Sequence, residues 1–142
     1  MILDKFLEFS KDQALLGVDA ASTNIADLGA AGDAIPELYL IVKVTNTADF
    51  ASGTSIKFDL QSDSADSFDS GAASAVEETL LTKTVLTAGL TANTEIFKTR
   101  VPLGQAKRYM RMYYDVTGTF DAGAIDAYLV MNVDHDNKVV SL

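Results

Sequence analysis

The sequence predicts an all-β protein, an antiparallel β-sandwich of about seven or eight strands with little helix. Two segments, Lys107–Val116 and Ile125–Val133, alternate between apolar and polar residues with a period of two, as half-buried strands do. Shorter β-branched segments recur along the chain with turn residues between them, and helix is expected only as a turn or two at Ala72–Glu78. Strands at this frequency are typical of a sandwich or a jelly roll.

The composition fits one globular domain and excludes several kinds of protein. Hydrophobic residues make up 48% of the 142, which is enough to build a core. The chain has no Cys, so a disulfide framework, a thiol nucleophile and a thiolate zinc site are excluded. The longest apolar run, Leu38–Val42, is too short to cross a bilayer. Charged residues interrupt the first ten positions, so we expect neither a signal peptide nor a membrane partner.

Residues 1–16 are predicted to be a terminal segment, followed by a single sandwich domain at 17–142. A helix fits the segment, with Ser10 and Gln13 as a capping box, and an extended arm fits it equally. Either form would bury the same side chains, over an open end of its own sandwich or on a neighbouring subunit. These side chains are Ile2, Leu3, Phe6, Leu7 and Phe9.

Five more segments are predicted to be strands before the last two. They are Ser22–Leu28, Leu38–Asn46, Ser55–Ser62, Leu80–Thr87 and Glu95–Val101. Leu38–Asn46 is apolar on both faces at its centre, as a central strand is. In Ser55–Ser62 the alternation places Ile56, Phe58 and Leu60 inward. Pro102 is expected to end the fifth strand, because proline cannot donate to a central ladder.

The last two strands are predicted to pair as a hairpin through Thr117–Ala124. Gly118 and Gly123 in this connection can adopt the positive φ that tight connections need. The alternation directs two sets of side chains to the core, namely Met110, Met112 and Tyr114 from the first strand and Ile125, Ala127, Leu129, Met131 and Val133 from the second.

Ser62–Thr79 is rich in Asp, Ser, Gly and Ala and is too long for a hairpin turn, so we expect a surface loop. Asp63, Asp66 and Asp69 suggest a calcium site, because hard cations prefer several oxygen ligands. Their spacing differs from that of a calcium-binding loop, which favours Asx turns and solvated carboxylates. Phe68 is predicted to hold the loop against the body, with a role as an exposed anchor as the alternative.

No motif in the sequence requires an enzyme. His135, the one histidine, lies beside Asp134 and Asp136, where a surface group is the usual role. A nucleophile elbow, a phosphate-binding loop and a dinucleotide-binding motif are all absent. We therefore expect no catalytic residue, no cofactor and no metal.

The net charge of −9 argues against nucleic acid as a partner, because phosphate binding depends on Lys and Arg. The basic residues are nevertheless unevenly distributed. Five of the eleven fall between positions 98 and 111, where there is no acidic residue, namely Lys98, Arg100, Lys107, Arg108 and Arg111. This asymmetry favours ion pairs between strands, with oriented docking on a partner as the alternative.

Three tyrosines near Arg111 are candidates for a contact patch, because interfaces are enriched in Tyr and Arg. The alternation assigns Tyr114 to the core. For Tyr109 and Tyr113 both interpretations stay open, half-buried packing against neighbouring strands and contact with a partner.

Four stretches carry a resemblance that covers most of the chain. They are MILDKFLEFSKDQAL, AASTNIADLG, GTSIKFDLQSDSADSFDSG and VPLGQAKRYMRMYYDVTGTFDAGAIDAYLVMNVD. In these patterns of strand and turn the chain resembles the jelly-roll capsid cement, or decoration, proteins of tailed bacteriophages, of the kind described for a Bordetella phage head. The most characteristic part of this resemblance is the predicted strand that begins with Lys107, Arg108 and Tyr109, together with its predicted hairpin partner.

The resemblance implies a jelly-roll domain on the outer surface of an HK97-like capsid in the virion, with no catalytic residues. Its implied partners are the phage major capsid protein, whose adjacent subunits it bridges, and itself as a dimer or trimer. The candidate capsid or self-contacts are Ile2, Leu3, Phe6, Leu7, Phe9, Lys98, Arg100, Lys107, Tyr109, Arg111 and Tyr113. The alternative is a sandwich module that binds carbohydrate or a receptor, which would need exposed aromatic residues.

Overall fold

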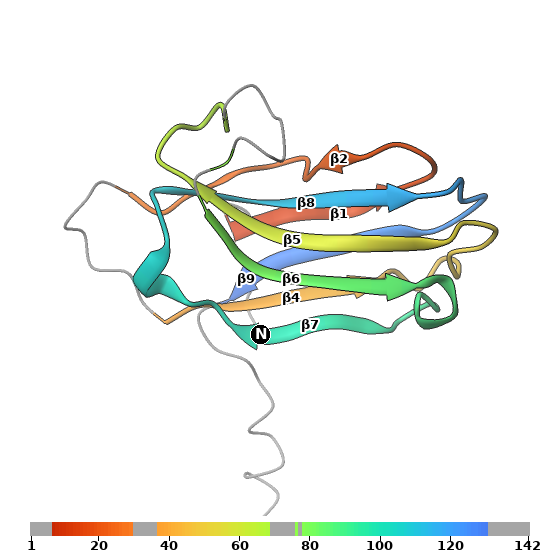
Figure 1. Ribbon diagram of the computed structural model, residues 1–142. Coiled ribbons are helices and arrows are strands. Elements are labelled where there is room, and N and C mark those ends of the chain that lie inside the picture. Colours follow the sequence, from red (N-terminus) through yellow and green to blue (C-terminus); the bar gives the residue numbers. More distant parts are fainter. Residues whose placement is uncertain (1–6, 30–36, 69–75, 77, 131–142) are drawn as a thin grey trace, which may run out of the picture.

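The computed structural model describes residues 7–29, 37–68, 76 and 78–130, which form two antiparallel β-sheets packed face to face (Figure 1). One sheet has the order β1-β9-β4-β7 and contains β1 (Glu8–Ala14), β9 (Ala124–Val130), β4 (Tyr39–Val44) and β7 (Glu95–Arg100). In the other, β2 (Ala20–Ala21) and β3 (Ala26–Asp27) both pair with β8 (Tyr109–Thr117), followed by β5 (Ser55–Asp63) and β6 (Glu78–Leu86). Two short 3-10 turns, η4 (Thr87–Gly89) and η5 (Leu103–Gln105), precede and follow β7.

The strand order confirms the prediction of a jelly roll. β2 and β3 pair with successive parts of β8, so the two short strands together occupy one position in the sheet. Counted this way, eight strand positions form two sheets of four, and the chain changes sheet at each step except between β5 and β6. This alternation between two facing sheets is the arrangement of an eight-stranded jelly roll.

The core lies between the two sheets and is built from one face of each strand, as the period-two patterns predict. Ile56, Phe58 and Leu60 of β5 are fully buried, and so are the expected core residues of β8 and of the described part of β9. These are Met110, Met112, Tyr114, Ile125, Ala127 and Leu129. Met131, Val133 and His135 lie outside the described residues.

The predicted hairpin between the last two strands is wrong. β8 lies in one sheet and β9 in the other, so the connection between them crosses from sheet to sheet. Gly118 and Gly123 do adopt positive φ, at 87° and 124°, and Phe120 between them packs edge to face on Phe50 with ring centroids 5.2 Å apart. The alternation pattern is the same for a hairpin and for a connection that crosses between sheets. In both cases each strand has one apolar face that turns to the core.

The consecutive strands that do pair are β5 and β6, although the sequence indicated a loop too long for a hairpin turn. Their ladder extends from Ser55 opposite Leu86 to Ser62 opposite Glu78. The cost of closing a loop grows only slowly with its length, so a long connection does not prevent two strands from pairing. Asp69 and most of Ala72–Glu78 lie outside the described residues.

Of the predicted strand Ser22–Leu28 only Ala26–Asp27, which is β3, forms a strand, and a second short strand, β2, ends just before Ser22. The amide of Met112 donates to the hydroxyl of Ser22 at 3.1 Å, and this hydroxyl donates to the carbonyl of Asn24 at 2.8 Å. The side chain therefore takes the place of a ladder bond, as serine can do.

For Glu8–Ala14 the structure decides between helix and extended chain. These residues form β1 and pair with β9, with register shifts around Ser10 and a positive φ of 47° at Asp12. The helical capping box is thus wrong: the Ser10 hydroxyl donates to Gln13 Oε1 at 2.6 Å within a bulged strand. Residues 1–6, with Ile2, Leu3 and Phe6, lie outside the described part of the chain.

Lys83 bridges the two sheets at the edge where β6 and β7 lie. It is opposite Phe58, which places its side chain on the inner face of β6. Its ammonium group donates to the carbonyl of Ile96 on β7 at 3.2 Å.

Within the described residues, no helix is long and apolar enough to span a membrane.

Candidate functional site

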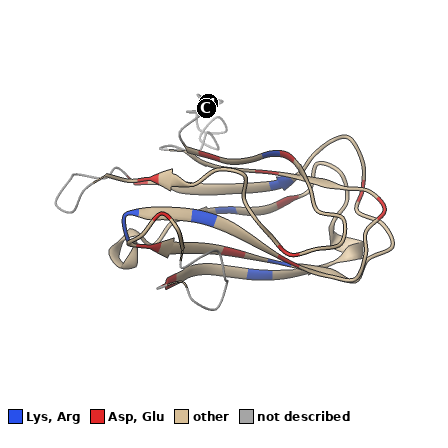
Figure 2. Cartoon of the chain, turned by 90° about the horizontal axis from the view of Figure 1, so that it is seen from above, with Lys and Arg blue, Asp and Glu red and all other residues tan. Residues whose placement is uncertain are grey.

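The basic segment 98–111 does not form one continuous patch. Lys98 and Arg100 lie on β7 in the four-stranded sheet, whereas Arg108 and Arg111 lie at or on β8 in the other sheet. Figure 2 accordingly shows Lys and Arg residues on several strands, with Asp and Glu residues among them. The two halves of the segment can therefore serve different purposes.

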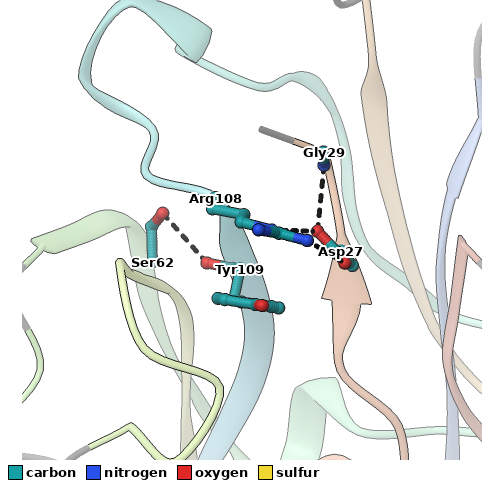
Figure 3. Close-up of polar contacts among 5 residues, drawn as sticks. All are labelled: Asp27, Gly29, Ser62, Arg108 and Tyr109. Atoms are coloured by element: carbon teal, nitrogen blue, oxygen red, sulfur yellow. Dashed lines mark hydrogen bonds and ion pairs between the residues drawn. The ribbon is translucent and has the colours of Figure 1, made fainter. Parts of the chain in front are cut away.

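Arg108 fixes the start of β8 to β3. Its Nε and Nη2 atoms donate to the two carboxylate oxygens of Asp27 at 2.9 and 3.1 Å (Figure 3). The amide of Gly29 donates to the same carboxylate at 2.9 Å. The hydrogen bond from Arg108, with that from Gly29, lowers the pKa of Asp27 below its usual value. This pair bears out, for Arg108, the expectation of ion pairs between strands.

Arg111 is buried on the outer face of the five-stranded sheet, with only 3% of its surface exposed. Its Nε donates to Gln61 Oε1 at 2.8 Å, and its guanidinium lies 4.5 Å from the ring centroid of Phe68 and 5.3 Å from that of Tyr113. Burial lowers the pKa of Arg111. Phe68 is itself fully buried, which confirms that it holds the loop against the body. We call Gln61, Phe68, Arg111 and Tyr113 the β8 cluster.

The tyrosines of β8 divide as the alternation predicts. Tyr114 lies in the core, and its ring packs edge to face on Phe58 with centroids 5.8 Å apart. Tyr109 and Tyr113 are half-buried on the opposite face. The guanidinium carbon of Arg108 lies 5.1 Å from the Tyr109 ring centroid, and the carbonyl of Tyr109 accepts a hydrogen bond from Ser62 at 3.1 Å (Figure 3).

Of the loop aspartates, Asp63 forms a turn, as expected. Asp63 is buried, and its Oδ1 accepts a hydrogen bond from the amide of Ala65 at 2.9 Å, which is an Asx turn. Asp66 is exposed, and Asp69 lies outside the described residues. In the part of the chain that the structure describes, no three acidic or histidine side chains are grouped so that they could hold a metal ion.

A second surface, which the sequence analysis did not single out, lies on the outer face of the four-stranded sheet. Ile41 pairs with Tyr128 and Tyr39 pairs with Val130 across β4 and β9. The two aliphatic side chains are buried and the two tyrosines are half-buried against them. We call these four residues the tyrosine face. The sequence did contain a signal for this surface. Leu38–Asn46 is apolar on both faces, so the side chains on its outer face also have to be packed against neighbours.

Charged residues border the tyrosine face on two sides. Lys98 lies opposite Ile41 and Arg100 opposite Tyr39, on the β7 side. Glu8 lies opposite Tyr128 on the β1 side, and Asp126 follows in the next outward row. Burial and, to a lesser extent, the charges of Asp126 and Glu95 raise the pKa of Tyr128.

A shallow depression adjoins this border at the end of β7. Its lining consists of Arg100, Val101, Pro102, Leu103 and Gly104. Val101 is buried, Leu103 is half-buried, and a Cβ atom at Gly104 would have no neighbour within 4 Å. Arg100 at the edge pairs with Glu37, with its Nε 3.3 Å from Glu37 Oε1.

Several predicted contact residues have internal roles. Phe9 is fully buried in the core and Arg111 is buried in the β8 cluster, so neither presents a surface to a partner. Leu7 is half-buried and packs against the core. Lys107 is exposed, and its amide donates to the Ser62 hydroxyl at 2.6 Å. Lys98 and Arg100 are exposed at the border of the tyrosine face.

A comparison with protein families finds a match to the family described as Bbp16, over residues 9–129. The chain belongs to the Bbp16 family. Bbp16 is a Bordetella phage-associated family name, in agreement with the resemblance to phage proteins. The Bbp16 match includes both sheets almost entirely, and with them the β8 cluster and most of the tyrosine face. A comparison with curated proteins finds no match.

Proposed function

We propose that this Bbp16 chain is a cement protein of a phage head, which binds the outside of the capsid and joins adjacent major capsid subunits. The observation that carries the proposal is the match over residues 9–129 to a phage-associated family. The proposal involves no reaction, no cofactor, no nucleic acid and no membrane. Its partners are the major capsid protein and further copies of this chain.

The physical properties of the chain support such a role. The jelly roll has two broad outer faces, and because the sequence has no Cys its fold does not depend on disulfides. Each contact with a shell subunit can be weak. A dimer or trimer that touches several subunits gains affinity through the high effective concentration of its second and third contacts.

The experiment that tests the proposal uses purified heads assembled without this protein. Added protein is expected to co-sediment with these heads at a saturating stoichiometry and to raise the temperature at which they rupture. Heads that already carry the protein are the control, and they should bind little more. Failure to bind undecorated heads, together with binding to host-cell carbohydrate, would favour the alternative of a carbohydrate- or receptor-binding module.

The role of the N-terminal segment can be tested in the same assay. Removal of residues 1–9 is expected to lower the occupancy of heads, because this segment holds apolar side chains at the end of the chain. Because Phe9 belongs to the core, a second deletion that stops at residue 6 separates loss of binding from loss of stability. Undiminished occupancy after the shorter deletion would show that residues 1–6 do not contact the shell.

A further inference from the structure

We propose that Asp19 and Asp115 form an acid-dependent clasp, in which the two carboxyl groups share one proton and hold the edge strand β2 to β8. The clasp is closed while the proton is bound, and it loosens when both groups are ionised. Asp19 lies directly before β2, at the edge of the five-stranded sheet, and Asp115 lies on β8 (Figure 1). The clasp is a property of the fold, so it does not depend on the proposed function.

The first argument is the position of the two residues. Ala20 of β2 lies opposite Tyr114 of β8 in an antiparallel pair. One step further in the same register, Asp19 stands opposite Asp115. The amide of Val116 donates to Asp19 Oδ1 at 2.8 Å, which holds this carboxyl group beside β8. Opposite residues of paired strands lie close together, and two like charges there destabilise the pairing.

The second argument is the small amount of positive charge that faces the pair. Lys57 on β5 lies opposite Asp115, on the side away from β2. Its ammonium group lies 3.4 Å from Asp59 Oδ2, and Asp59 also accepts a hydrogen bond from the Thr82 hydroxyl. Asp59 is buried, so it depends on these two partners. One lysine is therefore shared among three carboxyl groups, those of Asp19, Asp59 and Asp115.

The remaining neighbours on this face of the sheet add no cation beside the pair. Thr84 of β6 lies opposite Lys57, and the next residue of β8 on the same face is Tyr113. Burial and then the charge of Asp19 raise the pKa of Asp115, although Lys57 acts in the opposite direction. A protonated carboxyl group can donate to the ionised carboxylate opposite it, which turns a repulsion into a hydrogen bond.

The sign of the effect follows from the raised pKa of Asp115. The stability that the shared proton contributes is fully present below 3.8, and it is lost as the pH rises through the folded pKa. β2 contains two residues, so few ladder bonds hold it. Segments with few contacts open locally before the rest of a fold does. We therefore expect β2 to separate from β8 more often at neutral pH than in acid.

The shared proton is tested by an NMR titration of the side-chain carboxyl carbons. Asp115 of the parent should titrate above the usual range of aspartate. In Asp19→Asn, which keeps an oxygen for the Val116 amide but has no charge, the midpoint of Asp115 should fall by about 0.5 of a pH unit or more. Asp66→Asn, which removes an exposed loop carboxylate, is the control and should leave the midpoint unchanged. No fall in Asp19→Asn, or an equal fall in both variants, would overturn the proposal.

The opening of β2 is tested by native-state hydrogen exchange at two amides. The amide of Ser22 donates to the carbonyl of Met112 on β8, and that of Val116 donates to Asp19. Their protection, corrected for the intrinsic exchange rate at each pH, should fall about threefold or more between pH 4 and pH 7. In Asp115→Asn it should stay within about twofold, because the new amide group donates to Asp19 at both pH values.

Low concentrations of urea separate local opening from global unfolding. Exchange through a local opening of β2 should hardly respond to urea, because little surface is exposed, whereas exchange through global unfolding accelerates. Protection of Ser22 and Val116 that does not change with pH would overturn the clasp, and so would the same change in Asp115→Asn. Exchange as sensitive to urea as the unfolding of the whole chain would also overturn it, since β2 would then not open by itself.

Discussion

The hydroxyl of Tyr114 on β8 lies 2.7 Å from the hydroxyl of Ser10 on β1, so a buried hydrogen bond joins the two sheets through the core. Ser10 in turn donates to Gln13, whose Nε2 donates to the carbonyl of Ala21 at 2.9 Å. Burial raises the pKa of Tyr114, so this hydroxyl keeps its proton and stays a donor. The chain of bonds connects the edge strand β1 to both β8 and β2.

Replacement of Tyr114 by Phe should lower the free energy of unfolding by about 1 kcal/mol, the usual net value of one buried hydrogen bond. Equilibrium unfolding in urea measures the change. The Ser10→Ala variant is the partner of a double-mutant cycle, in which the two losses should not add because they remove the same bond. Full additivity would show that the two hydroxyls do not interact.

Replacement of Arg111 by Lys should destabilise the chain by about 1 to 3 kcal/mol, because an ammonium group cannot stack on both rings or keep the bond to Gln61. The loop base should then loosen and expose Phe68 to chymotrypsin. Limited proteolysis with identification of the cleavage site measures this exposure. Arg108→Lys, at an exposed pair, is the control and should leave Phe68 protected; equal cleavage in both variants would contradict the role of the β8 cluster.

Replacement of Gly123 by Ala should destabilise the fold by about 2 kcal/mol or more. The residue has a φ of 124°, and a Cβ atom would lie 2.4 Å from Cγ of Phe50. Thermal unfolding followed by circular dichroism measures the loss. Gly104→Ala, where a Cβ would meet nothing within 4 Å, is the control and should change the midpoint little. A Gly123→Ala variant as stable as the parent would mean that Phe50 can move aside freely.

Replacement of Asp115 by Asn should raise stability at neutral pH. Burial and the nearby Asp19 raise the pKa of Asp115 above 3.8, so the folded chain binds a proton that the unfolded chain has released. The stability of the parent therefore falls as pH rises from 3.8 through the folded pKa, and it stays lower above that range. The asparagine variant lacks this loss.

Thermal midpoints of parent and Asp115→Asn at pH 3.5 and pH 7 test the sign. The gain from the substitution should be larger at pH 7. Asp66→Asn removes an exposed loop carboxylate and should produce no comparable difference between the two pH values. An equal gain at both values would show that the effect does not come from ionisation of Asp115.

The strands could be predicted from the sequence because each buries one face, but their partners could not. The alternation in β8 and β9 specifies which residues enter the core, for instance Met112 and Ala127, and it is indifferent to whether the two strands pair or face each other. The break between β2 and β3 contains a side-chain hydrogen bond of Ser22 with Met112, ninety residues away in sequence. Neither the choice of strand partners nor this break can be recognised from the residues next to it in the sequence.

The surfaces were predicted less well, for a related reason. Segment 98–111 reads as one basic region, but η5 carries the chain from β7 to β8 and so divides its charges between the two sheets. Arg111 was expected at a surface and is buried by Phe68, which comes from a loop forty residues earlier. The apolar outer side of β4 was visible in the sequence, while its pairing with Tyr128 and Val130 required the sheet order.

The ammonium group of Lys83 also protects the edge strands β6 and β7 from pairing with a strand of another molecule. β6 and β7 end their sheets on the same side of the sandwich, where unpaired backbone groups would otherwise invite a strand from a neighbouring molecule. A strand added there would have to strip water from a charge already engaged with the Ile96 carbonyl. We therefore expect separate copies of this chain to remain individual folded units instead of merging into an extended fibre.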